Sequence, residues 1–195
     1  MSSGWSPGEN STLRRAIRDH ASGASLYFSG GVLPRPRDHS RMPGRYYEEF
    51  EVGETIEHEK RRTVSEADNQ RFCDATMNQQ PLHLDAEFAA DTQFGERIVN
   101  GLLTMSLAVG ITIPETTDGT IVANLSYDDV EHPAPVFHGD TVRVQSTIAD
   151  KRETSDGERG VVTFHVEVFA VNREDEPLVC EFDRTVLSLK REHAA

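Results

Sequence analysis

The chain has few cysteines, few lysines and no long apolar run, and each shortage excludes a class of protein. Its two cysteines, Cys73 and Cys180, are too few for a disulfide scaffold and lack the spacing of metal ligands. We expect both to be buried, reduced thiols. No apolar run approaches the roughly 18 residues that a membrane-spanning helix needs, and no uninterrupted apolar segment follows Met1 as in a signal peptide. We therefore expect no membrane partner and a cytoplasmic location.

Lysine occurs only three times, and acidic residues dominate the charge. Lys and Arg together number 20, Asp and Glu number 33, and the net charge is −13. An acidic excess with little lysine is the balance expected of a protein that stays soluble in concentrated salt; an ordinary acidic protein is the alternative. An acidic surface repels phosphate groups, so nucleic acid is not an expected partner.

The composition changes near residue 42. Residues 1–41 are rich in Ser, Gly and Arg and show no apolar period, which predicts a disordered N-terminal tail. The remainder, residues 42–195, is long enough for one domain with a sizeable core. We expect the tail to be dispensable for folding.

Apolar spacing and capping residues predict three helices in the first half of this domain. The sequence SEAD at residues 65–68 is similar to a capping box and predicts a helix over residues 66–76. Pro81 enforces extended backbone before itself, so we expect His83 in a loop, followed by a short helix over residues 85–91. Residues 101–113 are apolar almost all round, which predicts a fully buried helix that ends at Pro114.

The second half has the composition and alternation of β-strands. Strands are predicted over residues 120–130, 141–150, 160–172 and 178–189, after a polar strand-like segment at residues 54–63. In the third of the four, alternation places Val162, Phe164, Val166, Val168 and Ala170 on one face. Short turns rich in glycine and charge connect strands as antiparallel neighbours. One long apolar helix and a run of antiparallel strands indicate an α+β domain, with an antiparallel sheet wrapped around a buried central helix.

Two short motifs carry residues suited to acid–base chemistry. The first is QQPLHLDA at residues 79–86, and the second is IVNGLL at residues 98–103. His83 can act as a general base, because an imidazole has an unperturbed pKa of about 6.5. Gly101 opens a helix, where a free backbone N–H favours a developing negative charge. Together these two groups can polarise and attack a substrate with an activated carbonyl.

These motifs, with PVFHGDTV at residues 135–142, resemble those of the MaoC-like, (R)-specific enoyl-CoA hydratase family of hot-dog-fold proteins. The resemblance covers roughly residues 45–189. It implies a hot-dog fold and hydration of an α,β-unsaturated acyl-CoA, or the reverse dehydration of a 3-hydroxyacyl-CoA. It also implies no cofactor beyond the CoA of the substrate, and a homodimer or larger homo-oligomer. Asn78 stands where the general pattern has Asp, and Asn100 where it often has His. Both departures look like a subgroup that acts on branched or dicarboxylic esters such as mesaconyl-CoA or itaconyl-CoA.

Five residues have an expected role in the site. His83 is the expected base, Asn78 holds water through its amide, and the backbone N–H of Gly101 holds the developing oxyanion. Asn100 lines the same pocket, and Arg97 is a basic group that can attract the anionic CoA ester.

The amide of Asn78 cannot transfer a proton. Either His83 both takes and returns the proton, or a nearby carboxylate makes the second transfer. Asp74 and Asp85 are the candidates, although we interpret both as helix caps or solvated charges. His138 is interpreted as a turn residue, and no metal site is expected.

Two other functions fit the same fold. A hot-dog acyl-CoA thioesterase would use a carboxylate as base or nucleophile, which the Pro-Leu-His segment argues against. A non-catalytic acyl-CoA-binding module is permitted by the loss of the acid at Asn78, and fold alone does not decide between these functions.

Overall fold

The computed structural model describes residues 44–194, so the tail predicted for residues 1–41 lies outside the described residues. The helices are η1 (Tyr47–Glu49), α2 (Glu66–Thr76), α3 (Pro81–Leu84), α4 (Ala86–Ala90), α5 (Gly101–Thr116) and η2 (Arg191–His193). The strands are β1 (Thr55–Glu57), β2 (Arg62–Thr63), β3 (Ile121–Glu131), β4 (Thr141–Glu153), β5 (Arg159–Ala170) and β6 (Leu178–Leu189). No helix among residues 44–194 is both long and apolar enough to cross a membrane.

The six strands form one antiparallel sheet. Its order is β1-β4-β5-β6-β3, and β2 pairs with β4 as β1 does. The turns predicted between β4, β5 and β6 join neighbouring antiparallel strands, as expected. Strand β3 forms one edge and pairs with β6 through several register shifts. The four long strands lie within two or three residues of their predicted bounds, because alternation of buried and exposed side chains is a local signal.

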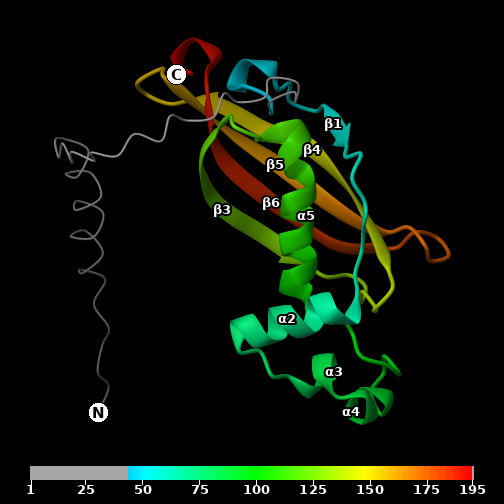
Figure 1. Cartoon of the computed structure of the whole chain (residues 1–195). Helices are drawn as coiled ribbons and strands as arrows, with labels where there is room; N and C mark the ends of the chain where they lie inside the picture. Colours follow the sequence, from blue (N-terminus) through cyan, green and yellow to red (C-terminus); the bar gives the residue numbers. More distant parts are fainter. Residues whose placement is uncertain (1–43, 195) are drawn as a thin grey trace, which may run out of the picture. The chain divides into compact units, whose positions relative to one another are not determined.

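Helix α5 packs on one face of this sheet and forms the core with it (Figure 1). Leu103, Met105, Ala108 and Ile111 form the buried side of the helix. The opposing face of β5 consists of Val162, Phe164, Val166, Val168 and Ala170, all buried, so the predicted alternation is confirmed. A sheet wrapped around one long helix is the hot-dog fold that the sequence indicates, in a single domain.

Two predictions about α5 need correction. The helix continues past Pro114 to Thr116, although proline lacks an N–H and its ring crowds the carbonyl of the residue four positions before it. The partner that this N–H would have had, the carbonyl of the exposed Gly110, can bond to water instead. The helix is also not buried on all sides. Leu102 is 58% exposed and Ile113 is 38% exposed, so one apolar face of α5 is left uncovered by the chain.

The segment before α5 follows the prediction in part. Helix α2 has the predicted bounds, and its capping box is formed by Ser65 Oγ, which accepts from the N–H of Asp68, and by the carboxylate of Asp68, which accepts from the N–H of Ser65. Gln80 is extended before Pro81, as expected. His83, however, lies in the single helical turn α3 rather than in a loop, because a proline favours the first position of a helix as well as ending the preceding one.

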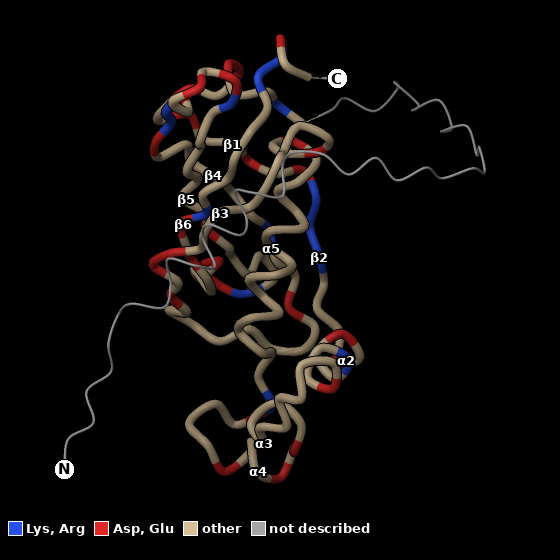
Figure 2. Tube along the Cα trace, turned by 90° about the vertical axis from the view of Figure 1, so that its left-hand side faces the viewer, with Lys and Arg blue, Asp and Glu red and all other residues tan. Residues whose placement is uncertain are grey.

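Acidic side chains surround the end of the molecule where α5 begins. Residues 66–97 include seven Asp and Glu residues against Arg71 and Arg97, and Figure 2 shows acidic residues on α2, on α4 and beside these helices. Helices α2 to α4 cluster at that end, and the C-terminal η2 lies at the opposite end of the sheet (Figure 1). An anionic ligand that enters here meets a negative surface.

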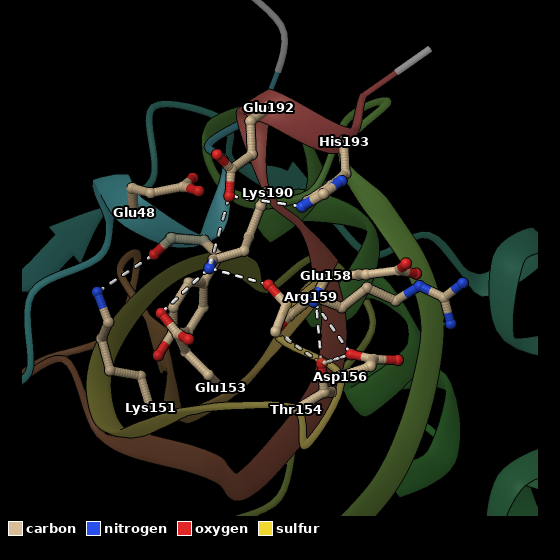
Figure 3. A network of polar contacts seen from close by, with 12 residues as sticks. Glu48, Lys151, Glu153, Thr154, Asp156, Glu158, Arg159, Lys190, Glu192 and His193 are labelled. Atoms are coloured by element: carbon tan, nitrogen blue, oxygen red, sulfur yellow. Dashed lines mark hydrogen bonds and ion pairs between the residues drawn. The ribbon is translucent and has the colours of Figure 1, made fainter.

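Two of the three lysines form hydrogen bonds at the opposite end of the domain, where η1 and η2 lie. Lys151 donates from Nζ to the carbonyl oxygens of Tyr47 (3.2 Å) and Phe50 (2.6 Å), which holds η1 on the sheet. Lys190 lies 3.2 Å from Glu153 and donates to the carbonyl of Gly157 at 3.0 Å (Figure 3). A compact ammonium group with three donors suits such converging carbonyls better than the planar fork of arginine.

Candidate active site

A pocket of about 440 Å³ lies where α5 begins. Its walls come from His83 of α3 and from residues on either side of the start of α5 and after β3: Gln93, Phe94, Ile98, Val99, Gly101, Thr104 and residues 132–136. Val179 of β6 closes it. The pocket therefore contains His83 and Gly101, the two residues on which the sequence-based assignment depends.

His83 is held in one orientation by a main-chain carbonyl. Its Nδ1 lies 3.0 Å from the carbonyl oxygen of Ile98, which can only accept a hydrogen bond, so Nδ1 carries the proton. The neutral imidazole then has its lone pair on Nε2, the nitrogen left to the pocket. Pro81 at the start of α3 fixes the backbone of this turn. His83 is thus set up as an acceptor of a proton at Nε2.

Gly101 is the first residue of α5 and offers an unpaired backbone donor. Among residues 44–194, no group accepts a hydrogen bond from its N–H. The N-terminus of a 16-residue helix adds a favourable potential for negative charge at the same place. An oxygen that gains charge in the pocket can therefore be stabilised by this N–H.

Asn69 links these two elements, and the sequence gives no sign of it. The side chain of Asn69 is buried in the middle of α2. Its Nδ2 donates to the carbonyl of His83 at 3.2 Å, and its Oδ1 accepts from the N–H of Asn100 at 2.9 Å. Asn69 thereby sets the position of the base relative to the start of α5. Its partners lie 14 and 31 residues away along the chain, so no local spacing predicts the contact.

His138 completes this network rather than acting only as a turn residue. Asn69 Nδ2 also donates to His138 Nε2 at 3.1 Å. Burial, and then the charge of Arg97, lower the pKa of His138 below the usual histidine value. A neutral His138 with a lone pair on Nε2 is the form that can accept this hydrogen bond.

His132 is a second histidine in the pocket, which sequence spacing does not single out. It follows the last residue of β3 and lies against Gly101. A Cβ atom placed on Gly101 would come within 2.8 Å of His132 Nε2 and 2.9 Å of its Cε1. Glycine at position 101 leaves room for this ring and also allows a ligand to approach the backbone closely.

The remaining predicted site residues, Asn78, Asn100 and Arg97, are not among those that line the pocket. Asn78 Oδ1 accepts from the N–H of Gln80 at 3.3 Å. Asn100 caps α5, because its Oδ1 accepts from the N–H of Leu102 at 3.0 Å, while its buried Nδ2 has no acceptor within residues 44–194. Arg97 lies 2.7 Å from Glu66. The roles of these three residues in binding or catalysis stay predictions.

The two candidate carboxylates have different surroundings. Asp85 caps α4 by accepting from the N–H groups of Glu87 (3.0 Å) and Phe88 (3.1 Å), as interpreted from the sequence. Asp74 is exposed on α2 and accepts from Gln70 at 3.1 Å. Neither lines the pocket.

Both cysteines are buried and free, as predicted. Burial raises the pKa of Cys73 and raises that of Cys180 to about 12. Thiols of this kind stay protonated near neutral pH, which disfavours a nucleophilic role.

Comparison with known proteins gives the family. The profile of the MaoC like domain matches residues 49–170. The chain is 34% identical over 152 residues to a mesaconyl-CoA hydratase of Cereibacter sphaeroides, a match that covers 78% of this chain and 43% of that protein. It is 32% identical over 106 residues to an (R)-specific enoyl-CoA hydratase of Rhodospirillum rubrum, which covers 53% of this chain and 69% of that protein. The chain thus spans less than half the length of the first of these relatives.

A solved structure agrees with this result. The monoamine oxidase regulatory protein from Archaeoglobus fulgius is 33% identical, superimposes with a TM-score of 0.68, and is matched over 77% of this chain and 97% of that chain. Sequence motifs, fold and comparisons all lead to the same conclusion: the chain belongs to the MaoC-like dehydratase family of hot-dog-fold proteins.

Proposed function

We propose that the chain hydrates an α,β-unsaturated acyl-CoA thioester, or runs the reverse dehydration of a 3-hydroxyacyl-CoA. The observation that carries this proposal is the pairing in one pocket of His83, oriented through Nδ1 by Ile98, with the N–H of Gly101. Such a pair supplies a base and an oxyanion donor, two of the groups that addition of water to an enoyl thioester requires. The names of the two relatives support the same reaction.

In this reaction His83 Nε2 takes a proton from water while the water oxygen bonds to Cβ of the enoyl group. The electrons of the double bond move to the thioester oxygen, and the N–H of Gly101 stabilises the enolate. The enolate then takes a proton at Cα from the His83 imidazolium, since the amide of Asn78 has none to transfer. A positioned acid–base group of this kind contributes about 10²–10⁴-fold to the rate.

We propose that the acyl chain of the substrate is short and branched. Phe94, Val136 and Val179 give it apolar walls, and about 440 Å³ suits a small ligand. Gln93 and Thr104 add side-chain donors that the second carboxylate of a dicarboxylic ester can accept from. Mesaconyl-CoA is therefore the first ester to test, supported by the likeness to a mesaconyl-CoA hydratase.

The acidic surface around the pocket bears on CoA binding. Phosphates of an acyl-CoA approach residues 66–97, where acids outnumber bases (Figure 2). At ~1 M salt the Debye length is only ~3 Å, so this repulsion is largely screened. We propose that Arg97, already close to Glu66, provides the local positive charge for the CoA portion.

A panel of thioesters tests the proposed function. The purified full chain is mixed with crotonyl-, mesaconyl- and itaconyl-CoA, and the enoyl absorbance and the free thiol are followed together. Loss of absorbance without thiol release supports hydration. Release of free thiol would indicate a thioesterase, and silence in both signals, with binding retained, would indicate a non-catalytic acyl-CoA-binding module. Either of these outcomes contradicts the proposal.

A further inference from the structure

The ring of His132 covers Gly101, and this contact is the least expected feature of the pocket. His132 Nε2 and Cε1 would lie 2.8 and 2.9 Å from a Cβ on Gly101, closer than side-chain atoms normally approach one another. The bare Cα of glycine leaves room for the ring. His132 is otherwise exposed, and no hydrogen bond joins its ring to another of residues 44–194. The fold gains no visible bond from the side chain, although it lines the pocket.

We propose that His132 is a second hydrogen-bond donor to the thioester oxygen, beside the backbone N–H of Gly101. This inference rests on the proposed function. The oxygen that accepts from Gly101 has to sit about 3 Å from its nitrogen. The imidazole of His132 lies against Gly101 and lines the same pocket, so it borders the position of the thioester oxygen. An oxyanion site with two donors is then formed by the start of α5 and by the segment after β3.

The assignment follows from the charge that appears during the reaction. When the water oxygen bonds to Cβ, the electron pair of the double bond becomes a negative charge on the thioester oxygen. We propose that His132 donates from Nε2–H to that oxygen and keeps its own proton. The proton that water loses goes to His83 and then to Cα of the enolate, so the balance of protons is unchanged. His132 therefore acts on the charge, and His83 acts on the proton.

A donor that matters mainly in the transition state changes kcat more than KM. His132→Phe keeps an aromatic ring over Gly101 and removes the N–H. Loss of one oxyanion donor costs about 10²–10³-fold in kcat, so we expect a loss of this size with KM changed less than about threefold. His132→Gln restores an N–H donor on a flexible chain, and it should recover a measurable part of the lost kcat relative to His132→Phe.

Two controls separate this effect from others. His193→Phe makes the same replacement in η2, at the opposite end of the sheet, and should leave kcat unchanged. His83→Gln removes the base, so the dependence of kcat on pH that is due to His83 should disappear. His132→Phe should instead lower kcat by the same factor at every pH and leave that dependence in place. Melting temperatures of all variants show that the fold is intact.

The test uses whichever thioester the wild-type chain turns over. If the wild type turns over none, the proposed function itself fails. If the wild type is active and His132→Phe keeps more than about a third of its kcat, the role given to His132 is wrong. The role would also be wrong if His132→Phe changed only KM, or if His132→Gln had a kcat no higher than that of His132→Phe.

Discussion

The carbonyl oxygen of Ile98 lies 3.0 Å from Nδ1 of His83, and this single contact decides which ring nitrogen is available to a substrate. Ile98 belongs to the isolated bridge that joins the segment before α5 to Phe137. The orientation of the base therefore depends on the same strand-like pairing that shapes the pocket. Because Nδ1 donates to this carbonyl, Nε2 of the imidazole is the nitrogen that can accept a proton from water.

Replacement of His83 tests its role as the base. His83→Ala should lower turnover of the best thioester by at least about 10²–10⁴-fold, because the proton-transfer group is gone. The side chain is only partly buried, so the melting temperature should change little. His165→Ala, on the sheet face away from α5, is the matched control. A folded His83→Ala variant that keeps most of its activity would show that the base lies elsewhere.

Replacement of Asn69 tests how the site is positioned. Asn69→Ala removes the donor to His83 and the acceptor for the N–H of Asn100, which leaves buried polar groups unpaired. We expect a loss of about 1–3 kcal/mol in the free energy of unfolding. We also expect kcat to fall at temperatures where the variant is still folded, so that unfolding does not account for the fall. Gln70→Ala, an exposed neighbour on α2, should change neither quantity. Denaturant titration and steady-state kinetics measure the two effects, and full kcat in Asn69→Ala would refute the positioning role.

The sequence predicts the elements of this fold better than it predicts the site. Alternation in β5 and the capping box at Ser65 are local signals, and both are found where expected. His83 and Gly101 are also recognisable, because each belongs to a short motif. Asn69 and His132 reach the site only through the packing of α2 and of the segment after β3, and neither has a partner at a fixed spacing in the chain.

The errors on α5 have a related cause. Apolar composition predicts that a helix is buried, but it does not say by which chain. Leu102 and Ile113 are as apolar as the residues that face the sheet, yet they remain exposed in the single chain. The prediction that α5 is buried on all sides was therefore wrong for the single chain, which does not cover these residues.

Substitution at Asn78 tests the departure from the general family pattern. The carboxylate of Asn78→Asp can still accept from the N–H of Gln80, so the variant should fold as the wild type does. We expect it to retain activity on crotonyl-CoA and to show an additional ionisation in its pH profile, because it adds a titratable carboxylate five residues before His83 in the chain. Asn78→Ala should lower activity. Gln79→Glu adds the same charge one residue away and is the control.

Two outcomes at Asn78 would change the interpretation. Loss of activity on mesaconyl-CoA alone in Asn78→Asp would indicate that a negative charge repels the second carboxylate of the substrate. Wild-type behaviour of both variants on every ester would remove Asn78 from the chemistry and leave His83 and Gly101 to carry it.

Stability should depend on pH through His58. This residue is buried, with Nδ1 3.1 Å from Glu115 and Nε2 2.9 Å from the hydroxyl of Ser146. Burial lowers its pKa; the carboxylate of Glu115 opposes that shift, and the charge of Arg45 adds to it. A group with a depressed folded-state pKa contributes stability that is present above the unfolded value of about 6.5 and is lost as pH falls below it.

We therefore expect a constant melting temperature between pH 7 and 8 and a decline from about pH 6.5 to 5. His58→Gln should be less stable at pH 7.5 and should show a shallower decline. His138 has a lowered pKa as well, so His138→Gln measures its separate share of the decline. Scanning calorimetry across this range checks the sign, and an unchanged slope in His58→Gln would show that other groups titrate.

The uncovered apolar face of α5 predicts how the chain associates. It continues onto the edge strand β3 through a shallow hollow lined by Leu102, Met105, Ser106, Val109 and Tyr127. On β3 itself, Leu125 is 51% exposed. An exposed apolar patch of this kind beside an open strand edge is a surface for association, and we expect a homodimer in which the same face meets its copy.

Leu125→Glu places a negative charge on that face. In a symmetric dimer both copies bring this charge to the interface. We expect the variant to run as a monomer in size-exclusion chromatography with light scattering at concentrations where the wild type is a dimer. Val52→Glu, which changes a residue 59% exposed in the turn before β1, should leave the mass unchanged. If the wild type is monomeric at every concentration, or if Leu125→Glu keeps the dimer mass, this face of α5 and β3 is not the surface through which copies of the chain associate.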